Sequence, residues 1–88
     1  MKLIRFGAIW CPACLIMRPR YNKVLENFKD ITSYEYDYDM DENLVNEYKI
    51  GKILPEAILY DDNDTELERI VGEVSLDKLM DIIKKYRK

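Results

Sequence analysis

The chain has 88 residues, of which 48% are hydrophobic and 35% are charged, and it contains only three glycines and three prolines. This composition is typical of one folded globular domain, with no low-complexity segment. The formal net charge of −3 argues against a nucleic-acid-binding surface, and no apolar stretch approaches the roughly 18 residues that a transmembrane helix needs. We therefore expect neither nucleic acid nor a membrane as a partner.

The first part of the chain predicts a strand, a helix and a second strand. Residues 2–9 form a nearly continuous apolar run that only Arg5 interrupts, which indicates a buried strand. From Cys11 onward the apolar residues recur at the helical period as far as Phe28. Residues 31–39 alternate between tyrosines and acidic residues, so they predict a strand with one wetter face.

The second part predicts a short helix, two strands and a final helix. Asp41 can cap the short helix, and a loop over residues 50–55 leads into a strand over residues 56–60. The polar tract 61–65 then turns the chain back into a strand over residues 67–71, and Ser75 can cap the last helix. The first two strands are expected to be parallel across a helical crossover and the last two to form a hairpin. The sequence therefore predicts an α/β fold with one mixed, four-stranded sheet and helices on both faces.

The two cysteines, Cys11 and Cys14, lie at the predicted junction between the first strand and the first helix. The first turn of a helix presents unpaired N–H groups and the positive end of the helix dipole, which stabilise a thiolate there. Cys11 is therefore the candidate nucleophile, and Cys14, one turn further on, is the candidate resolving thiol that attacks a mixed disulfide formed on Cys11. Pro12 suits the first helical turn, where its missing N–H costs nothing.

Two other roles for the cysteine pair fit less well. Tetrahedral zinc needs four ligands, whereas the chain has two cysteines and no histidine, so we expect no metal and no cofactor. A structural disulfide between neighbours three positions apart would close almost no loop and would stabilise the fold little.

A cytoplasmic location is expected. The basic residues near the start and the apolar run after them have the charge order of a secretory signal, but Pro12 interrupts the run and a basic segment follows it. In the cytoplasm a C-x-x-C pair is more often catalytic than structural.

At this point the chain resembles the thioredoxin family over nearly its whole length, but without that family's first strand and helix. The matching features are Trp10 before the first cysteine, the C-x-x-C pair, Pro19 inside the helix, the segment Tyr48-x-Ile50, Pro55, and the segment 71–75 that opens the final helix. The resemblance implies one thioredoxin-like domain over residues 1–88 and a cis Pro55 lying against the cysteines. It also implies a substrate-binding surface formed by Trp10, Pro12, Leu54, Pro55 and Gly72, where the Leu54 backbone pairs with an extended substrate segment.

The activity implied by the resemblance is thiol–disulfide exchange with protein disulfides. A flavoprotein of the thioredoxin-reductase type, or glutathione, would supply the electrons. Two alternatives remain open. The chain could be a glutathione-dependent protein similar to glutaredoxins, although Gly72-Glu73 stands where that family usually has two glycines. It could also be a non-catalytic module that binds partners through the same surface and senses redox state.

The chain departs from the family pattern at three places. Arg5 and Glu35 stand where the family usually has an aspartate and a lysine, as if one ion pair had been kept with its polarity exchanged. Glu35 would then transfer protons for Cys14 through water, or Arg5 would favour the thiolate. Equally open is that Glu35 is a solvated residue and that Arg5 extends outward to solvent.

The other two departures concern partners. Glu56 follows Pro55 where the family often has a small hydroxyl residue, and an acid there would repel acidic partners. The missing first strand leaves residues 31–39 at a sheet edge, whose acidic residues discourage pairing with another chain. We therefore expect a monomer.

Overall fold

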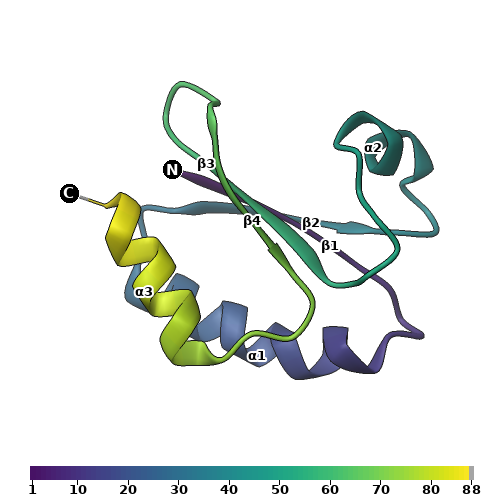
Figure 1. Ribbon diagram of the computed structural model, residues 1–88, viewed down its shortest axis with the longest axis horizontal. Coiled ribbons are helices and arrows are strands. Elements are labelled where there is room, and N and C mark those ends of the chain that lie inside the picture. The colour runs from purple at the N-terminus through teal and green to yellow at the C-terminus, as the bar shows by residue number, and fades with distance from the viewer. Residues whose placement is uncertain (88) are drawn as a thin grey trace.

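The computed structural model describes residues 1–87, and Figure 1 shows how their helices and strands are arranged. The elements follow the predicted order, but the first two strands are shorter than the predicted ranges 2–9 and 31–39. They are β1 (Lys2–Gly7), α1 (Pro12–Asn27), β2 (Thr32–Asp37), α2 (Glu42–Glu47), β3 (Glu56–Tyr60), β4 (Glu66–Val71) and α3 (Leu76–Tyr86). No helix among residues 1–87 is long and apolar enough to cross a membrane.

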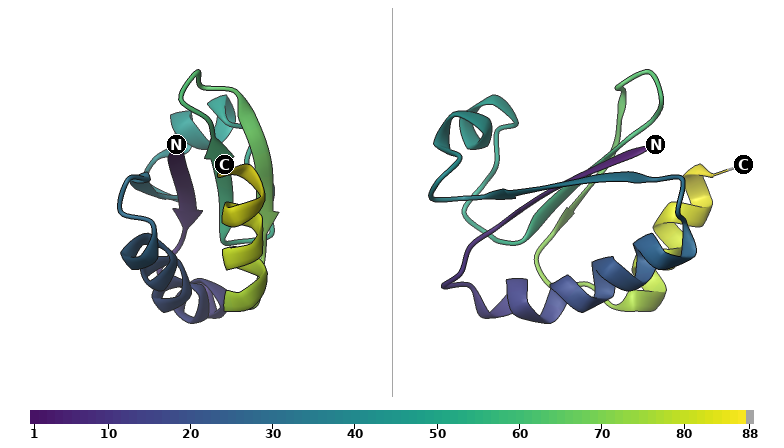
Figure 2. Two further views of the ribbon diagram at one scale, coloured as in Figure 1. Left: turned by 90° about the vertical axis from the view of Figure 1, so that its left-hand side faces the viewer. Right: turned by 180° about the vertical axis from the view of Figure 1, so that it is seen from behind.

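The strands form one sheet in the order β2-β1-β3-β4. β1 is parallel to β2 and antiparallel to β3, and β3 and β4 form an antiparallel hairpin. Helices α1 and α3 lie together on one face of the sheet, whereas α2 lies over one end of the other face (Figures 1 and 2). The predicted mixed four-stranded α/β fold is therefore confirmed.

The core consists of two clusters, one on each face of the sheet. The cluster under α1 and α3 includes Leu3, Met17 and Leu59, and the cluster on the α2 side includes Ile4, Phe6 and Ile58. Neighbouring residues of β1 belong to different clusters because successive side chains of a strand point to opposite faces. Burial on both faces explains the apolar residues within β1, whereas Ile9 lies beyond the strand and is 89% exposed.

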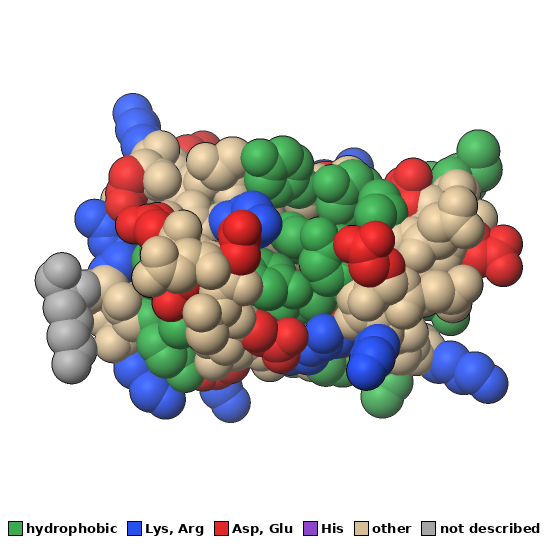
Figure 3. All heavy atoms as spheres, turned by 90° about the horizontal axis from the view of Figure 1, so that it is seen from above, with side chains coloured by type: hydrophobic (Ala, Val, Ile, Leu, Met, Phe, Trp, Pro, Cys, Tyr) green, Lys and Arg blue, Asp and Glu red, His purple; other side chains and the backbone are tan. Residues whose placement is uncertain are grey.

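The face on the α2 side is only partly covered. Figure 3 looks onto this side of the molecule and shows a band of hydrophobic side chains between charged groups. Tyr36 and Tyr60 are partly buried against the cluster there, and Tyr34 is 44% exposed.

The two predicted helix caps differ in outcome. Ser75 caps α3 as expected, because its Oγ accepts a hydrogen bond from the Lys78 N–H at 3.2 Å. Asp41 occupies the cap position of α2, but its side chain makes no capping bond there. Its Oδ2 instead accepts the Asp37 N–H at 2.8 Å and closes the turn that follows β2.

The N-terminus and the end of α3 lie away from the start of α1. Figure 1 shows the N-terminus and the end of α3 at one end of the molecule, and the β1–α1 junction at the other. The N-terminal ammonium group of Met1 forms an ion pair with Asp62 in the β3–β4 turn, at 2.5 Å.

Candidate active site

Cys11 is the N-cap residue of α1, with extended backbone angles of φ −96° and ψ 111°. Its Sγ accepts a hydrogen bond from the Cys14 N–H at 3.3 Å, so a sulfur takes the place that a serine or aspartate oxygen commonly has at this position. A thiolate is the better acceptor for such a donor, and the positive end of the helix dipole favours its charge. Pro12 occupies the first turn, and both cysteines are free.

The loop that precedes β3 covers Cys11, which is only 6% exposed. The Leu54 carbonyl oxygen lies 3.6 Å from Cys11 Sγ, within reach of the thiol hydrogen. The Leu54–Pro55 peptide bond is cis. The Pro55 carbonyl accepts the Gly72 N–H at 2.8 Å, which joins the loop to the end of β4. Three of the predicted substrate-binding residues, Leu54, Pro55 and Gly72, are therefore connected to one another and to Cys11.

Gly72 has a positive φ of 77°, a conformation that other residues adopt only with strain. A Cβ added there would lie 3.5 Å from the Cγ2 atom of Ile53 in the loop. Glycine therefore allows the chain to turn immediately beside Pro55.

Exposed apolar side chains flank the cysteines in the sequence. Ile9 is 89% exposed and Trp10 59% exposed, although both directly precede Cys11. The indole Nε1 of Trp10 donates a hydrogen bond to Asp39 Oδ2 at 2.6 Å, which fixes the ring against the segment after β2. Pro12 is also exposed. Large exposed apolar groups of this kind mark a surface suited to binding another chain.

Cys14 is partly buried and lines a cavity of about 350 Å³ between α1 and the sheet. Burial, together with a hydrogen bond to Cys11, raises the pKa of the Cys14 thiol to about 11, so this sulfur is protonated at neutral pH. Gly7 makes room for it, because a Cβ at that residue would lie 3.4 Å from Cys14 Sγ. Nothing in the sequence pattern indicates this role of Gly7.

Arg5 and Glu35 also line this cavity and form an ion pair, with Arg5 Nη2 3.0 Å from Glu35 Oε2. They are register partners on β1 and β2, which places both side chains on the α1 face. The Arg5 side chain is 12% exposed and that of Glu35 is 45% exposed. Burial lowers the pKa of the Arg5 guanidinium, and Glu35 opposes this effect. The sequence left open whether Arg5 and Glu35 form an ion pair or extend separately to solvent, and in the structure they form the ion pair.

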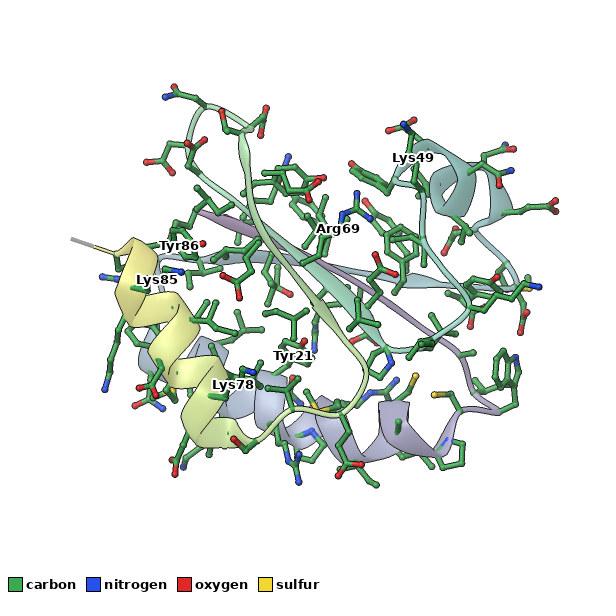
Figure 4. All side chains as sticks on the ribbon, viewed as in Figure 1. Tyr21, Lys49, Arg69, Lys78, Lys85 and Tyr86 are labelled. Carbon is green, nitrogen blue, oxygen red and sulfur yellow. The ribbon has the colours of Figure 1, made fainter. Side chains whose placement is uncertain are left out.

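Two residues of this cavity were missed by the sequence analysis. Arg18 Nη2 lies 3.3 Å from Glu35 Oε1, and the ring of Tyr21 lies 5.6 Å from the Arg5 guanidinium carbon. Figure 4 labels Tyr21 between α1 and the sheet. Burial raises the pKa of the Tyr21 hydroxyl. Both residues lie on the same helix face as Cys14, four and seven positions after it. This helical spacing is the sequence signal from which their place beside Cys14 could have been predicted.

The structure contradicts the expected role of Glu56. This residue was expected to repel acidic partners at the docking surface, but it is only 4% exposed. Its Oε2 forms an ion pair with Arg69 Nη1 at 2.8 Å, and its Oε1 accepts the Gly51 N–H at 3.1 Å. The prediction was wrong because Glu56 points to the α2 face of the sheet, where Arg69 on β4 neutralises it.

The comparison with known proteins agrees with this geometry. A family model described as thioredoxin matches residues 1–85. A thioredoxin of Mycoplasmoides gallisepticum is 30% identical over 82 residues, which cover 93% of this chain and 80% of that protein.

Solved structures give the same result. A structure described as thioredoxin-2, a component of the malaria parasite protein secretion machinery, superposes with a TM-score of 0.88 at 31% identity, over 97% of this chain and 82% of that one. A thioredoxin from Nicotiana alata superposes with a TM-score of 0.87 at 28% identity, over 99% of this chain and 73% of that one. The chain therefore belongs to the thioredoxin family and is a thiol–disulfide oxidoreductase.

Proposed function

We propose that Cys11 and Cys14 carry out the exchange as nucleophile and resolving thiol, with proteins as the disulfide substrates. The observation that carries this proposal is the position of Cys11 Sγ, which lies at the start of α1 and 3.6 Å from the Leu54 carbonyl of the covering loop. A sulfur held at a helix start is activated as a thiolate and lies where an extended segment can approach it.

In the first step the Cys11 thiolate attacks one sulfur of the substrate disulfide. The substrate S–S bond breaks, one substrate cysteine leaves as a thiolate, and Cys11 forms a mixed disulfide with the other. Cys14 then loses its proton and attacks Cys11 Sγ. The mixed disulfide breaks, the second substrate thiolate leaves, and a Cys11–Cys14 disulfide forms, so two electrons pass from the protein to the substrate.

The second step needs a base, because the pKa of Cys14 is raised to about 11. We assign this role to Glu35, which acts through water in the cavity that it shares with Cys14. Arg5 holds the Glu35 carboxylate at 3.0 Å and adds a positive charge beside the cavity, which favours a thiolate. Arg5 is thus the ion-pair partner in the proposal and Glu35 the proton acceptor.

The substrate-binding surface consists of Trp10, Pro12, Leu54, Pro55 and Gly72. The first two contribute exposed apolar area, and the Leu54 backbone pairs with an extended substrate segment. We further propose that residues 1–88 act as one cytoplasmic, monomeric domain. A flavoprotein of the thioredoxin-reductase type or glutathione returns it to the dithiol form.

Insulin reduction tests the activity. With dithiothreitol as reductant, the protein accelerates insulin precipitation, and Cys11→Ser abolishes the acceleration. Cys14→Ala accumulates mixed disulfides on Cys11 in cell extract. If no such adducts form, exchange is not the function and a non-catalytic binding module is favoured. Turnover with glutathione and its reductase, but not with a thioredoxin-type flavoprotein reductase, would favour the glutaredoxin-like alternative.

A further inference from the structure

The docking loop, defined here as residues 50–55 between α2 and β3, places a carbonyl group beside the reactive sulfur but has an exposed tip. Ile53 is 66% exposed, whereas Leu54 is buried, with its carbonyl oxygen 3.6 Å from Cys11 Sγ. The position of this loop therefore decides where a substrate segment that pairs with Leu54 lies relative to Cys11.

One buried carboxylate holds both ends of the docking loop. Glu56 follows Pro55 directly and begins β3, so its backbone fixes the end of the loop. Its Oε1 accepts the N–H of Gly51, near the start of the loop, at 3.1 Å. The loop is thus closed by a hydrogen bond between residues five positions apart. A carboxylate buried to this degree needs such donors, because an unpaired buried charge is costly.

Arg69, on β4, extends this link to the turn that follows α2. Its Nη1 donates to Glu56 Oε2 at 2.8 Å and to the Lys49 carbonyl at 3.4 Å. Figure 4 labels Arg69 and Lys49 on the same side of the sheet. Arg69 also binds Glu66 of its own strand, with Nε 2.9 Å from Oε2. Glu66 hydrogen-bonds to Arg69 and makes no hydrogen bond to a residue of the docking loop among the contacts described for residues 1–87.

We propose that Glu56 is a positioning residue for substrate docking, whose carboxylate holds the docking loop beside Cys11 through Gly51 and Arg69. The proposal rests on the proposed function, in which Leu54 pairs with the substrate. Glu56 forms no hydrogen bond with either sulfur, so it acts on the binding of a protein substrate and leaves the reactivity of the thiols unchanged.

The test compares Glu56→Gln with the matched control Glu66→Gln, which removes the other carboxylate bound to Arg69. Each reduced protein is mixed rapidly with increasing concentrations of insulin, and the fluorescence of the only tryptophan, Trp10, reports oxidation. Glu56→Gln is expected to raise the half-saturating insulin concentration about fivefold, as for the loss of one hydrogen bond from the docked state. Its limiting rate, and its rate with the small disulfide dithiobis(nitrobenzoate), stay unchanged. Glu66→Gln behaves as the parent in all three measurements.

An unchanged half-saturating concentration in Glu56→Gln overturns the proposal, and so does an equal slowing of the small disulfide. If Glu56→Gln does not fold, Arg69→Gln replaces it, because this variant keeps the bond between Glu56 and Gly51 but removes the ion pair between Arg69 and Glu56 and the link to Lys49. It must then raise the half-saturating concentration relative to Glu66→Gln, and no difference overturns the proposal. A parent protein that reduces neither disulfide overturns the proposed function itself, which is a separate result.

Discussion

The ion pair between Arg5 and Glu35 allows a quantitative test, because Glu35 binds two arginines in different environments. The Arg5 side chain is 12% exposed, whereas that of Arg18 is 61% exposed. Breaking a fully buried pair costs about 3–5 kcal/mol, and an exposed pair is worth about 0–1 kcal/mol. Since Glu35 itself is 45% exposed, we expect a coupling energy of about 2 kcal/mol with Arg5 and below about 1 kcal/mol with Arg18.

Two double-mutant cycles measure these energies. One combines Glu35→Ala with Arg5→Leu, and the other combines Glu35→Ala with Arg18→Leu, with the free energy of unfolding taken from urea titrations. Glu35→Ala alone leaves the Arg5 charge without its carboxylate partner and should lower the melting temperature by about 10 °C in a domain of this size. Adding Arg5→Leu should restore part of this loss. A coupling energy with Arg5 that does not exceed that with Arg18 would refute the reasoning that burial makes this pair strong.

Three further predictions concern the sulfurs and their surroundings. Because burial raises the pKa of Cys14 to about 11, the alkylation of Cys14 by iodoacetamide should be slow at neutral pH and should become faster as the pH rises toward that value. Mass spectrometry measures the alkylation rate at each pH. A rate that reaches half its maximum near the ordinary pKa of 9.0 would contradict this prediction. Gly72→Ala should lower the free energy of unfolding by about 1–3 kcal/mol, since φ at this residue is 77°, and an unchanged urea midpoint would show that the turn relaxes without strain. Trp10→Ala should slow insulin reduction while changing stability by less than about 1 kcal/mol, because the ring is 59% exposed; equal insulin reduction by variant and parent would remove Trp10 from the docking surface.

The order of the elements could be predicted from the sequence because each has a strong period or turn signal. Leu3, Ile4 and Phe6 are apolar because β1 is buried on both faces, and Ser75 precedes a helical pattern that it caps. The position of Cys11 at the start of a helix followed from the change of period at that residue. These signals are local, so they do not depend on how the elements pack.

The direction of individual charged side chains could not be predicted in the same way. Glu56 was expected at the surface, but it faces inward because the hairpin pairs it with Val71 and thereby places Arg69 on the same face. Asp41 was expected to cap α2, yet its carboxylate closes the preceding turn. The partner of Glu56 lies on another strand and is known only once the strand register is known, whereas Asp41 accepts the Asp37 N–H within the same turn.

The placement of the N-terminus and the end of α3 has a practical consequence for experiments. A fluorescent label, a surface linker or a second protein domain attached beyond Tyr86 would be held at the end of the molecule opposite the cysteines, so large disulfide-bearing substrates could still approach them (Figure 1). Attachment at Met1 is less suitable, because acylating its amine would remove the charge that pairs with Asp62.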